Sequence, residues 1–218
     1  DVVHDIAGNN DCTIKKDPKW GNGKRGGGLI LNGSTNYLDC GNDASFNITK
    51  TLTIAVWVNI KAFGNWDGIV TKGVESGPYA MQMWGDGSLR FSPNWGNPEG
   101  FVNKGSFNTN SKMTAGKWTH AAITYDGAKA NFYINGKKDK LEVKQAFTFG
   151  INKDPLILGC DFPGGDEYFD GVMDEVFIFN QALTSAEIVK VMNGGIVAVS
   201  KAGKISVAWG KIKSTNTQ

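Results

Sequence analysis

The sequence predicts an all-β protein, a two-sheet antiparallel β-sandwich (jelly roll) with one short helix near the C-terminus. Apolar and polar residues alternate with a period of two in most segments, which is typical of half-buried strands. Asp-Gly and Asn-Gly turn signals separate these segments. Glycine supplies 29 of the 218 residues, nearly twice the usual ~7%. These three observations indicate many short strands joined by tight turns.

The clearest strand runs from Leu52 to Ile60. Every even-numbered position in it is aliphatic, whereas the odd-numbered positions are Thr53, Ala55, Trp57 and Asn59. Alternate side chains of a strand point to opposite faces, so we expect the aliphatic set to face a core. Further strands are predicted at residues 79–84, 89–91, 118–125, 131–134, 155–158 and 172–179.

One helix is predicted, over residues 183–192. Thr184 as N-cap and Glu187 three residues later form a capping-box pattern, and Gly194 and Gly195 are suited to end the helix. Residues 196–200 and 204–212 then predict a small amphipathic hairpin. We therefore expect one domain over residues 1–195 and a β-hairpin tail or linker over residues 196–218.

Charge and cysteine content exclude several classes. Lys+Arg 23 against Asp+Glu 21 gives a net charge of +2 without any block of like charge, which argues against a nucleic-acid partner. No apolar run is long enough for membrane insertion. Cys12, Cys40 and Cys160 lack the spacing of a zinc or redox motif. One disulfide with one free thiol, or three buried thiols, both remain open. The start at Asp1 suggests a processed product or a piece of a longer chain.

Several motifs resemble, in order and spacing, a known family. The strongest are Lys117-Trp-Thr-His-Ala-Ala-Ile-Thr-Tyr-Asp-Gly127, Tyr133-Ile-Asn-Gly136 and the segment from Phe169 to Asn180 that contains Met-Asp-Glu-Val. With weaker matches around Gly28 and Leu52, they cover residues 2–193. The chain resembles laminin-G-like (LamG-like) jelly-roll domains of the concanavalin A-like lectin/glucanase superfamily. The resemblance implies a curved sheet and an extracellular or cell-surface location.

The resemblance also implies a structural calcium ion (Ca2+). Its ligands would be the side chains of Asp5 and Asp174 and backbone carbonyls near Ala7 and Leu31, since calcium takes six to eight oxygen ligands. The alternative is that Asp5 caps a turn and Asp174 pairs with a strand neighbour. A second metal in the loop 159–167, where related pentraxins bind calcium, is less favoured than a solvated turn.

A sugar-binding face is the third candidate. Gln82, Trp84 and Arg90 fall on one side of two paired strands, and aromatic rings with planar polar side chains suit sugar recognition. Trp66 and Trp95 lie in neighbouring loops, and Asp161 lies in the loop 159–167. The alternative is that the tryptophans cover sheet edges.

Catalysis is not expected. The Glu-x-Asp-x-(x)-Glu carboxylates of hydrolases that resemble this fold are missing from the sequence, as is the Gln-x-His of its lyases. His4 and His120 are the two histidines, and His120 lies at a structural strand position. We expect a non-enzymatic extracellular binding module for glycan, within a larger multidomain chain. The alternative is a protein–protein adhesion or assembly domain that binds an extracellular protein.

Overall fold

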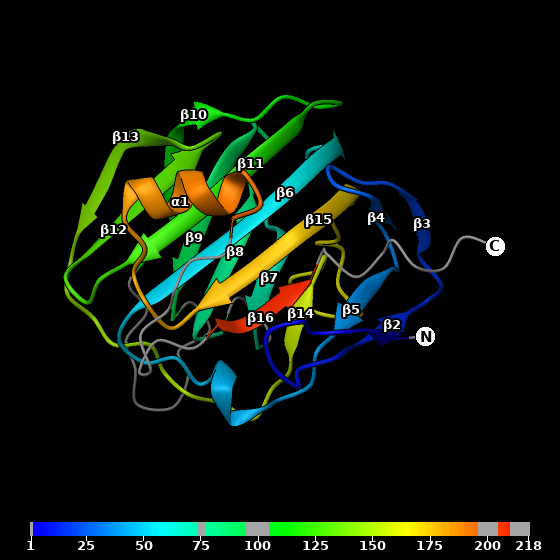
Figure 1. Cartoon of the computed structure of the whole chain (residues 1–218), viewed down its shortest axis with the longest axis horizontal. Helices are drawn as coiled ribbons and strands as arrows, with labels where there is room; N and C mark the ends of the chain where they lie inside the picture. The colour runs from blue at the N-terminus through cyan, green and yellow to red at the C-terminus, as the bar shows by residue number, and fades with distance from the viewer. Residues whose placement is uncertain (1, 74–76, 95–104, 196–204, 210–218) are drawn as a thin grey trace.

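The structure, a computed structural model, describes residues 2–73, 77–94 and 105–195 and the backbone of residues 205–209. Two antiparallel sheets pack face to face (Figure 1), which confirms the predicted β-sandwich. Sheet A has the order β1-β2-β5-β14-β7-β8-β9-β10. Its strands are β1 (Val2–Val3), β2 (Cys12–Lys15), β5 (Tyr37–Asp39), β14 (Leu156–Leu158), β7 (Asp67–Lys72), β8 (Tyr79–Met83), β9 (Ser88–Pro93) and β10 (Phe107–Lys112).

Sheet B has the order β13-β12-β11-β6-β15-β4-β3. Its strands are β13 (Lys137–Lys144), β12 (Lys129–Ile134), β11 (Trp118–Tyr125), β6 (Leu52–Ala62), β15 (Asp170–Phe179), β4 (Gly27–Asn32) and β3 (Lys19–Asn22). Along one edge of β15, β4 pairs with the first half and β16 (Ile205–Trp209) with the second. A 3-10 helix, η1 (Ala44–Phe46), follows β5.

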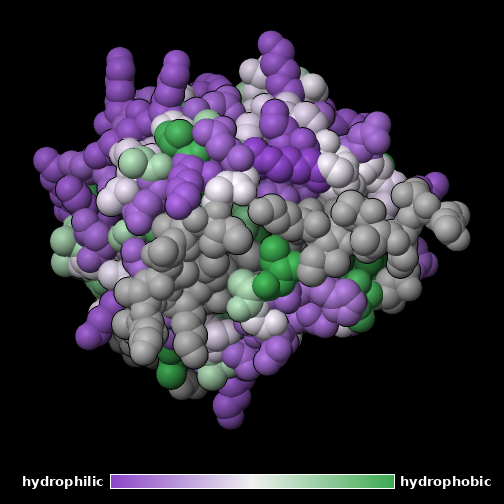
Figure 2. Space-filling view, viewed as in Figure 1, coloured by the Kyte–Doolittle hydropathy of each residue, from purple (hydrophilic) through white to green (hydrophobic). Residues whose placement is uncertain are grey.

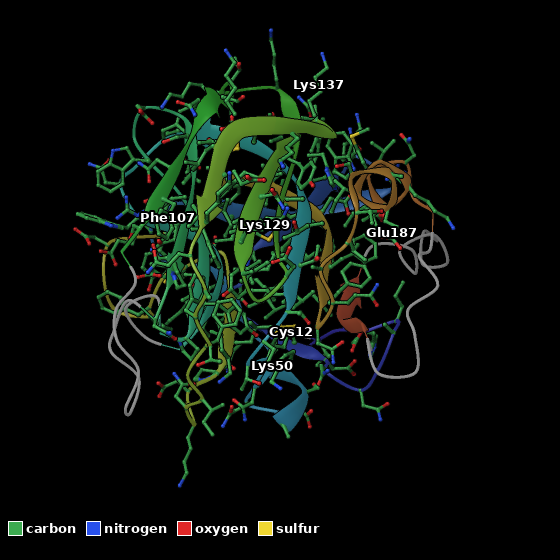
Figure 3. All side chains as sticks on the ribbon, turned by 90° about the vertical axis from the view of Figure 1, so that its left-hand side faces the viewer. Cys12, Lys50, Phe107, Lys129, Lys137 and Glu187 are labelled. Atoms are coloured by element: carbon green, nitrogen blue, oxygen red, sulfur yellow. A yellow bond between two sulfur atoms is a disulfide. The ribbon has the colours of Figure 1, made fainter. Side chains whose placement is uncertain are left out.

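The core lies between the two sheets and follows the predicted alternation. Leu52, Ile54, Val56, Val58 and Ile60 of β6 are all buried in it, as expected. Sheet A contributes alternate residues in the same way; these include Met81, Met83, Leu89 and Phe91. Figure 3, which looks onto the edge of the sandwich, shows the two layers side by side, with α1 outside sheet B.

The helix α1 (Ser185–Met192) covers part of the outer face of sheet B (Figure 1). Thr184 and Glu187 form the predicted capping box. At the other end the C-cap is Asn193, and Gly194 takes a φ of +79°. Ile188 and Val191 pack against apolar residues of sheet B, so tertiary packing, and not helix propensity alone, stabilises this short helix.

The structure decides between the alternatives for the cysteines. Cys12 and Cys40 form a disulfide, and Cys160 is a buried free thiol. Burial raises the pKa of Cys160 to about 12, so the thiol stays protonated at neutral pH. A buried, protonated thiol is a structural side chain and not a reactive one.

The expected C-terminal hairpin falls mostly outside the described residues. Residues 196–204 and 210–218 are not described, and residues 205–209 form β16, which pairs with β15. The division at residue 195 therefore stays a prediction. Within the described part of the chain, no helix has the length and apolar character needed to cross a membrane. Outside the grey atoms, most of the face shown in Figure 2, that of sheet B and α1, is hydrophilic.

Candidate functional site

The outer face of sheet A brings together five of the six residues that the sequence singled out for ligand binding. Gln82 on β8 is paired in register with Arg90 on β9. Trp84 follows β8 directly, and Trp66 directly precedes β7. Asp161 reaches the same face from the loop between β14 and β15. We call these five residues the sheet A site. Trp95, the sixth, lies outside the described residues.

The loop that carries Trp66 is held in a strained conformation by short polar contacts. Trp66 has a φ of +64°, a region that bulky residues rarely adopt. Asp67 Oδ2 accepts a hydrogen bond from the Gly64 amide at 2.8 Å, and Asn65 Oδ1 accepts one from the Gly85 amide at 3.0 Å. Backbone strain of this kind persists only where the surroundings enforce it, and it is common at functional sites.

The two tryptophans form a pair above an arginine. The rings of Trp66 and Trp84 meet edge to face, with centroids 4.6 Å apart and an interplanar angle of 87°. The Arg90 guanidinium carbon lies 4.6 Å from the Trp84 ring centroid and 5.7 Å from that of Trp66. Both distances lie within the range of cation–π attraction. Arg90 therefore fixes the positions of both rings from below.

Only the tryptophans of the sheet A site reach the surface to any extent. Trp66 is 37% exposed and Trp84 is half-buried, whereas Gln82 is 0%, Asp161 4% and Arg90 8% exposed. The expectation that Gln82, Trp84 and Arg90 together form an open polar face therefore needs correction. The polar residues lie beneath the tryptophan pair and support it.

A hydrogen-bond network connects the buried polar residues. Gln82 Nε2 donates to Asp161 Oδ1 at 3.0 Å, and Gln82 Oε1 accepts from Ser92 Oγ at 2.8 Å. Arg90 Nη1 donates to Asn108 Oδ1 at 2.9 Å. Buried hydrogen bonds of this kind hold side chains in one arrangement. The site is thus organised before any ligand arrives.

The loop containing Asp161 packs closely on β7. The amides of Gly68 and Asp161 both donate to the Glu167 carbonyl, at 3.2 and 3.0 Å. A Cβ at Gly68 would lie only 2.2 Å from the carbonyl carbon of Cys160, so glycine is required at this approach. The predicted solvated turn was wrong for Cys160 and Asp161, which are buried. Asp166 is exposed, as a turn residue would be.

Burial also changes the electrostatics of the site. It raises the pKa of Asp67 to about 6, with smaller contributions from the negative charges of Asp170 and Asp166. Burial lowers the pKa of Arg90, and the neighbouring Asp161 opposes that change. At neutral pH the negative charge of Asp161 therefore offsets the positive charge of Arg90, and Asp67 adds a further carboxylate nearby.

Sequence reasoning missed three residues of this region: Asp67, Ser92 and Asn108. The alternation along β9 places Ser92 on the same face as Arg90, so Ser92 could have been predicted from the sequence. Asn108 could not have been predicted, because its contact with Arg90 depends on the pairing of β10 with β9. The role of Asp67 depends on the fold of its loop.

The predicted calcium ligands are engaged in local hydrogen bonds. Asp5 accepts from the amides of Ala7 and Asn10 at 2.9 and 3.2 Å, which is the turn role given above as the alternative. Asp174 accepts from the amides of Arg25 and Glu175, both at 2.9 Å. Among the described residues no group of three or more His, Cys, Asp and Glu side chains is placed to hold a metal.

The predicted ligand set also includes two backbone carbonyls, near Ala7 and Leu31. Leu31 pairs with Gly171 within sheet B. Calcium stays a prediction, and the melting temperature with and without a chelator tests it, since a bound metal stabilises the folded state.

The environment of His120 is that of a structural residue and not that of a general base. It is buried, and its ring contacts the Trp57 ring at 5.3 Å between centroids. Burial, with a smaller effect of the Arg25 charge, lowers the pKa of His120 to about 3. A histidine that stays neutral at physiological pH and has no access to solvent is poorly suited to proton transfer.

Comparison with known proteins agrees with this fold. A laminin G family model, described as concanavalin A-like lectin/glucanases superfamily, matches residues 32–189. The chain belongs to this superfamily. A search among curated proteins gives no match.

Solved structures of several binding domains are similar in fold. Domain 4 of AbnA, an extracellular GH43 arabinanase from Geobacillus stearothermophilus solved with arabinotriose, has a TM-score of 0.64 at 19% identity, covering 88% of this chain and 87% of that one. A Bacteroides ovatus protein of proposed carbohydrate binding has a TM-score of 0.65 at 19% identity, covering 88% and 52%.

A third similar structure is the binding domain of Paraclostridial Mosquitocidal Protein 1. Its TM-score is 0.67 at 15% identity, and the match covers 88% of this chain and 51% of that one. The chain thus spans about half the length of the Bacteroides ovatus and mosquitocidal chains that it matches. At these identities the likeness shows the fold alone.

Proposed function

We propose that this chain is a non-catalytic carbohydrate-binding module whose ligand stacks on Trp66 and Trp84. The observation that carries the proposal is the strained, exposed Trp66, held edge to face against Trp84 above a buried polar network. Indole rings present flat apolar surfaces to the C–H faces of sugars at low entropic cost. Gln82, Arg90 and Asp161 act as positioning residues beneath these rings.

The comparisons support this function in general terms. The similar structures are binding domains, one of them solved with arabinotriose. The Cys12–Cys40 disulfide supports an oxidising, extracellular location, because such bonds persist mainly outside the reducing cytosol. The partial coverage of two of the matched chains is consistent with a module of a larger protein.

A glycan array followed by calorimetric titration tests the proposal. Arabinotriose and neutral oligosaccharides of xylose, glucose, galactose and mannose are suitable probes. Trp66→Ala should weaken binding about tenfold or more, since one lost stacking contact is worth roughly 1–2 kcal/mol. Trp20→Ala is the matched control, because Trp20 is 47% exposed but lies on β3 of sheet B.

Equal affinity of Trp66→Ala and the unchanged protein would overturn the proposed site. A blank array would instead favour a protein partner. One similar structure, the binding domain of botulinum neurotoxin DC, was solved with rat synaptotagmin II. Binding to a protein would then be sought at loops and sheet edges.

A further inference from the structure

Among the described residues, several carboxylates lie near the tryptophan pair. Asp166 is exposed and Glu167 is half-buried in the loop that packs on β7. Asp67 adjoins Trp66 in sequence, and the charges of Asp166 and Asp170 both act on its carboxylate. A ligand that stacks on Trp66 therefore approaches through a region of carboxylates.

Two described cations of this region, Lys61 and Arg90, each have an acidic neighbour. Lys61 Nζ lies 3.2 Å from Asp170 Oδ2, in a salt bridge. Arg90 is buried, donates to Asn108 and is attracted by Asp161. Its guanidinium also lies over the Trp84 ring, which separates it from solvent on that side. Neither cation is placed to bind the carboxylate or sulfate of an acidic sugar.

The two observations point to a class of ligand. We infer that the sheet A site selects neutral glycans and rejects glycans that carry carboxylate, sulfate or phosphate groups. The inference rests on the proposed function and narrows it. Apolar stacking attracts neutral and acidic sugars alike, so the discrimination comes from like-charge repulsion by Asp166 and Glu167. Asp166 is exposed, so its repulsion of a charged ligand is weakened by salt.

A matched pair of probes tests the inference. The tightest neutral oligosaccharide with primary alcohols is compared with the same oligosaccharide after oxidation of those alcohols to carboxylates. At low salt the oxidised form should bind about tenfold more weakly. The ratio should approach one at 0.5 M NaCl, where charges separated by more than ~4 Å are largely screened.

Charge-removing variants identify the source of the discrimination. Asp166→Asn with Glu167→Gln keeps the size of both side chains and leaves the backbone bonds of the Glu167 carbonyl in place. This double variant should bind the neutral probe as before and the oxidised probe more tightly. Asp126→Asn, in the turn between β11 and β12, is the control that should leave the ratio unchanged.

The outcomes separate this inference from the proposed function. Equal or tighter binding of the oxidised probe, lost in Trp66→Ala, would overturn the neutral preference and leave the carbohydrate-binding site standing. An unchanged ratio in the double variant would also overturn the inference. Absence of any Trp66-dependent glycan binding would overturn the proposed function, and this inference with it.

Discussion

Each outer face of the sandwich has a tryptophan with a cation over its ring, but the two arrangements are inverted. On sheet B, Trp57 is 7% exposed, and the exposed Lys24 places its Nζ 4.2 Å from the ring centroid. On sheet A, Arg90 is buried and the tryptophans lie outside it. On sheet B the cation covers the aromatic ring, whereas on sheet A the aromatic rings cover the cation.

The two arrangements differ because the end of α1 covers Trp57 on sheet B, whereas no helix covers the tryptophans of sheet A among the described residues. Trp57 Nε1 donates to the Met192 carbonyl at the end of α1, at 3.2 Å, so the helix terminus closes over the ring. Arg25 Nη2 donates to the same carbonyl at 2.9 Å. On sheet A the polar groups bond to one another beneath the rings. Trp57 therefore contributes to stability, whereas Trp66 and Trp84 remain at the surface.

Substitution of Trp57 should have the strongest effect on stability. Trp57→Ala should lower the free energy of unfolding by about 3–5 kcal/mol, the usual range for removing a buried large aromatic side chain. Glycan affinity should not change, because Trp57 lies on the opposite sheet. Chemical denaturation and calorimetric titration measure the two quantities.

Lys24→Ala is the control for this variant, since an exposed cation–π contact contributes only about 0.5–1 kcal/mol. A loss of glycan binding in Trp57→Ala protein that remains folded would contradict the assignment of the two faces.

An intermediate effect is expected at Arg90. Arg90→Met keeps much of the side-chain length but leaves Asp161 without its countercharge, so it should lower the free energy of unfolding by about 2–4 kcal/mol. It should also weaken glycan binding, because Trp84 loses the support of the guanidinium. Denaturation and titration of the same samples separate the two effects.

Arg90→Lys is the informative companion, since lysine keeps the charge without the planar stacking group. If Arg90→Met bound glycan as tightly as the unchanged protein, Arg90 would not be a positioning residue.

The smallest effect is a pH dependence at Asp67. Its pKa is raised to about 6, so the folded state favours the protonated carboxyl. That stability is fully present below pH ~3.8 and is lost as the pH rises through 6. Asp67→Asn should therefore match the unchanged protein near pH 3.5 and be more stable by about 1–3 kcal/mol at pH 7.5.

The amide oxygen of the new asparagine can still accept the bond from the Gly64 amide, so the loop should be preserved. Thermal melts across pH 3.5–8 provide the measurement, with Asp126→Asn as a variant in an exposed turn. Parallel profiles for Asp67→Asn and the unchanged protein would show that Asp67 does not titrate in this range.

Local pattern was enough to predict strands β6, β8, β9, β11, β12, β14 and β15, the core face of β6 and the capping box of α1. It missed β1 to β5, β7, β10 and β13. It was also enough to place Gln82 and Arg90 on one face. Alternation and capping depend on neighbouring residues, so one sequence contains this information. The alternation fails at β15, where the pairing shifts between Asp174 and Phe177 and Glu175 takes a φ of +51°.

The alternation of residues, the turn signals and the shared face of Gln82, Trp84 and Arg90 are all contained in the sequence. Tertiary structure alone decided that Cys12 pairs with Cys40, that Asp161 is buried, and that Arg90 lies beneath Trp66 and Trp84. The reason is physical: exposure, ion pairing and disulfide formation depend on which distant segments pack together. Those contacts arise only when the sheets, the loop 159–167 and α1 are assembled.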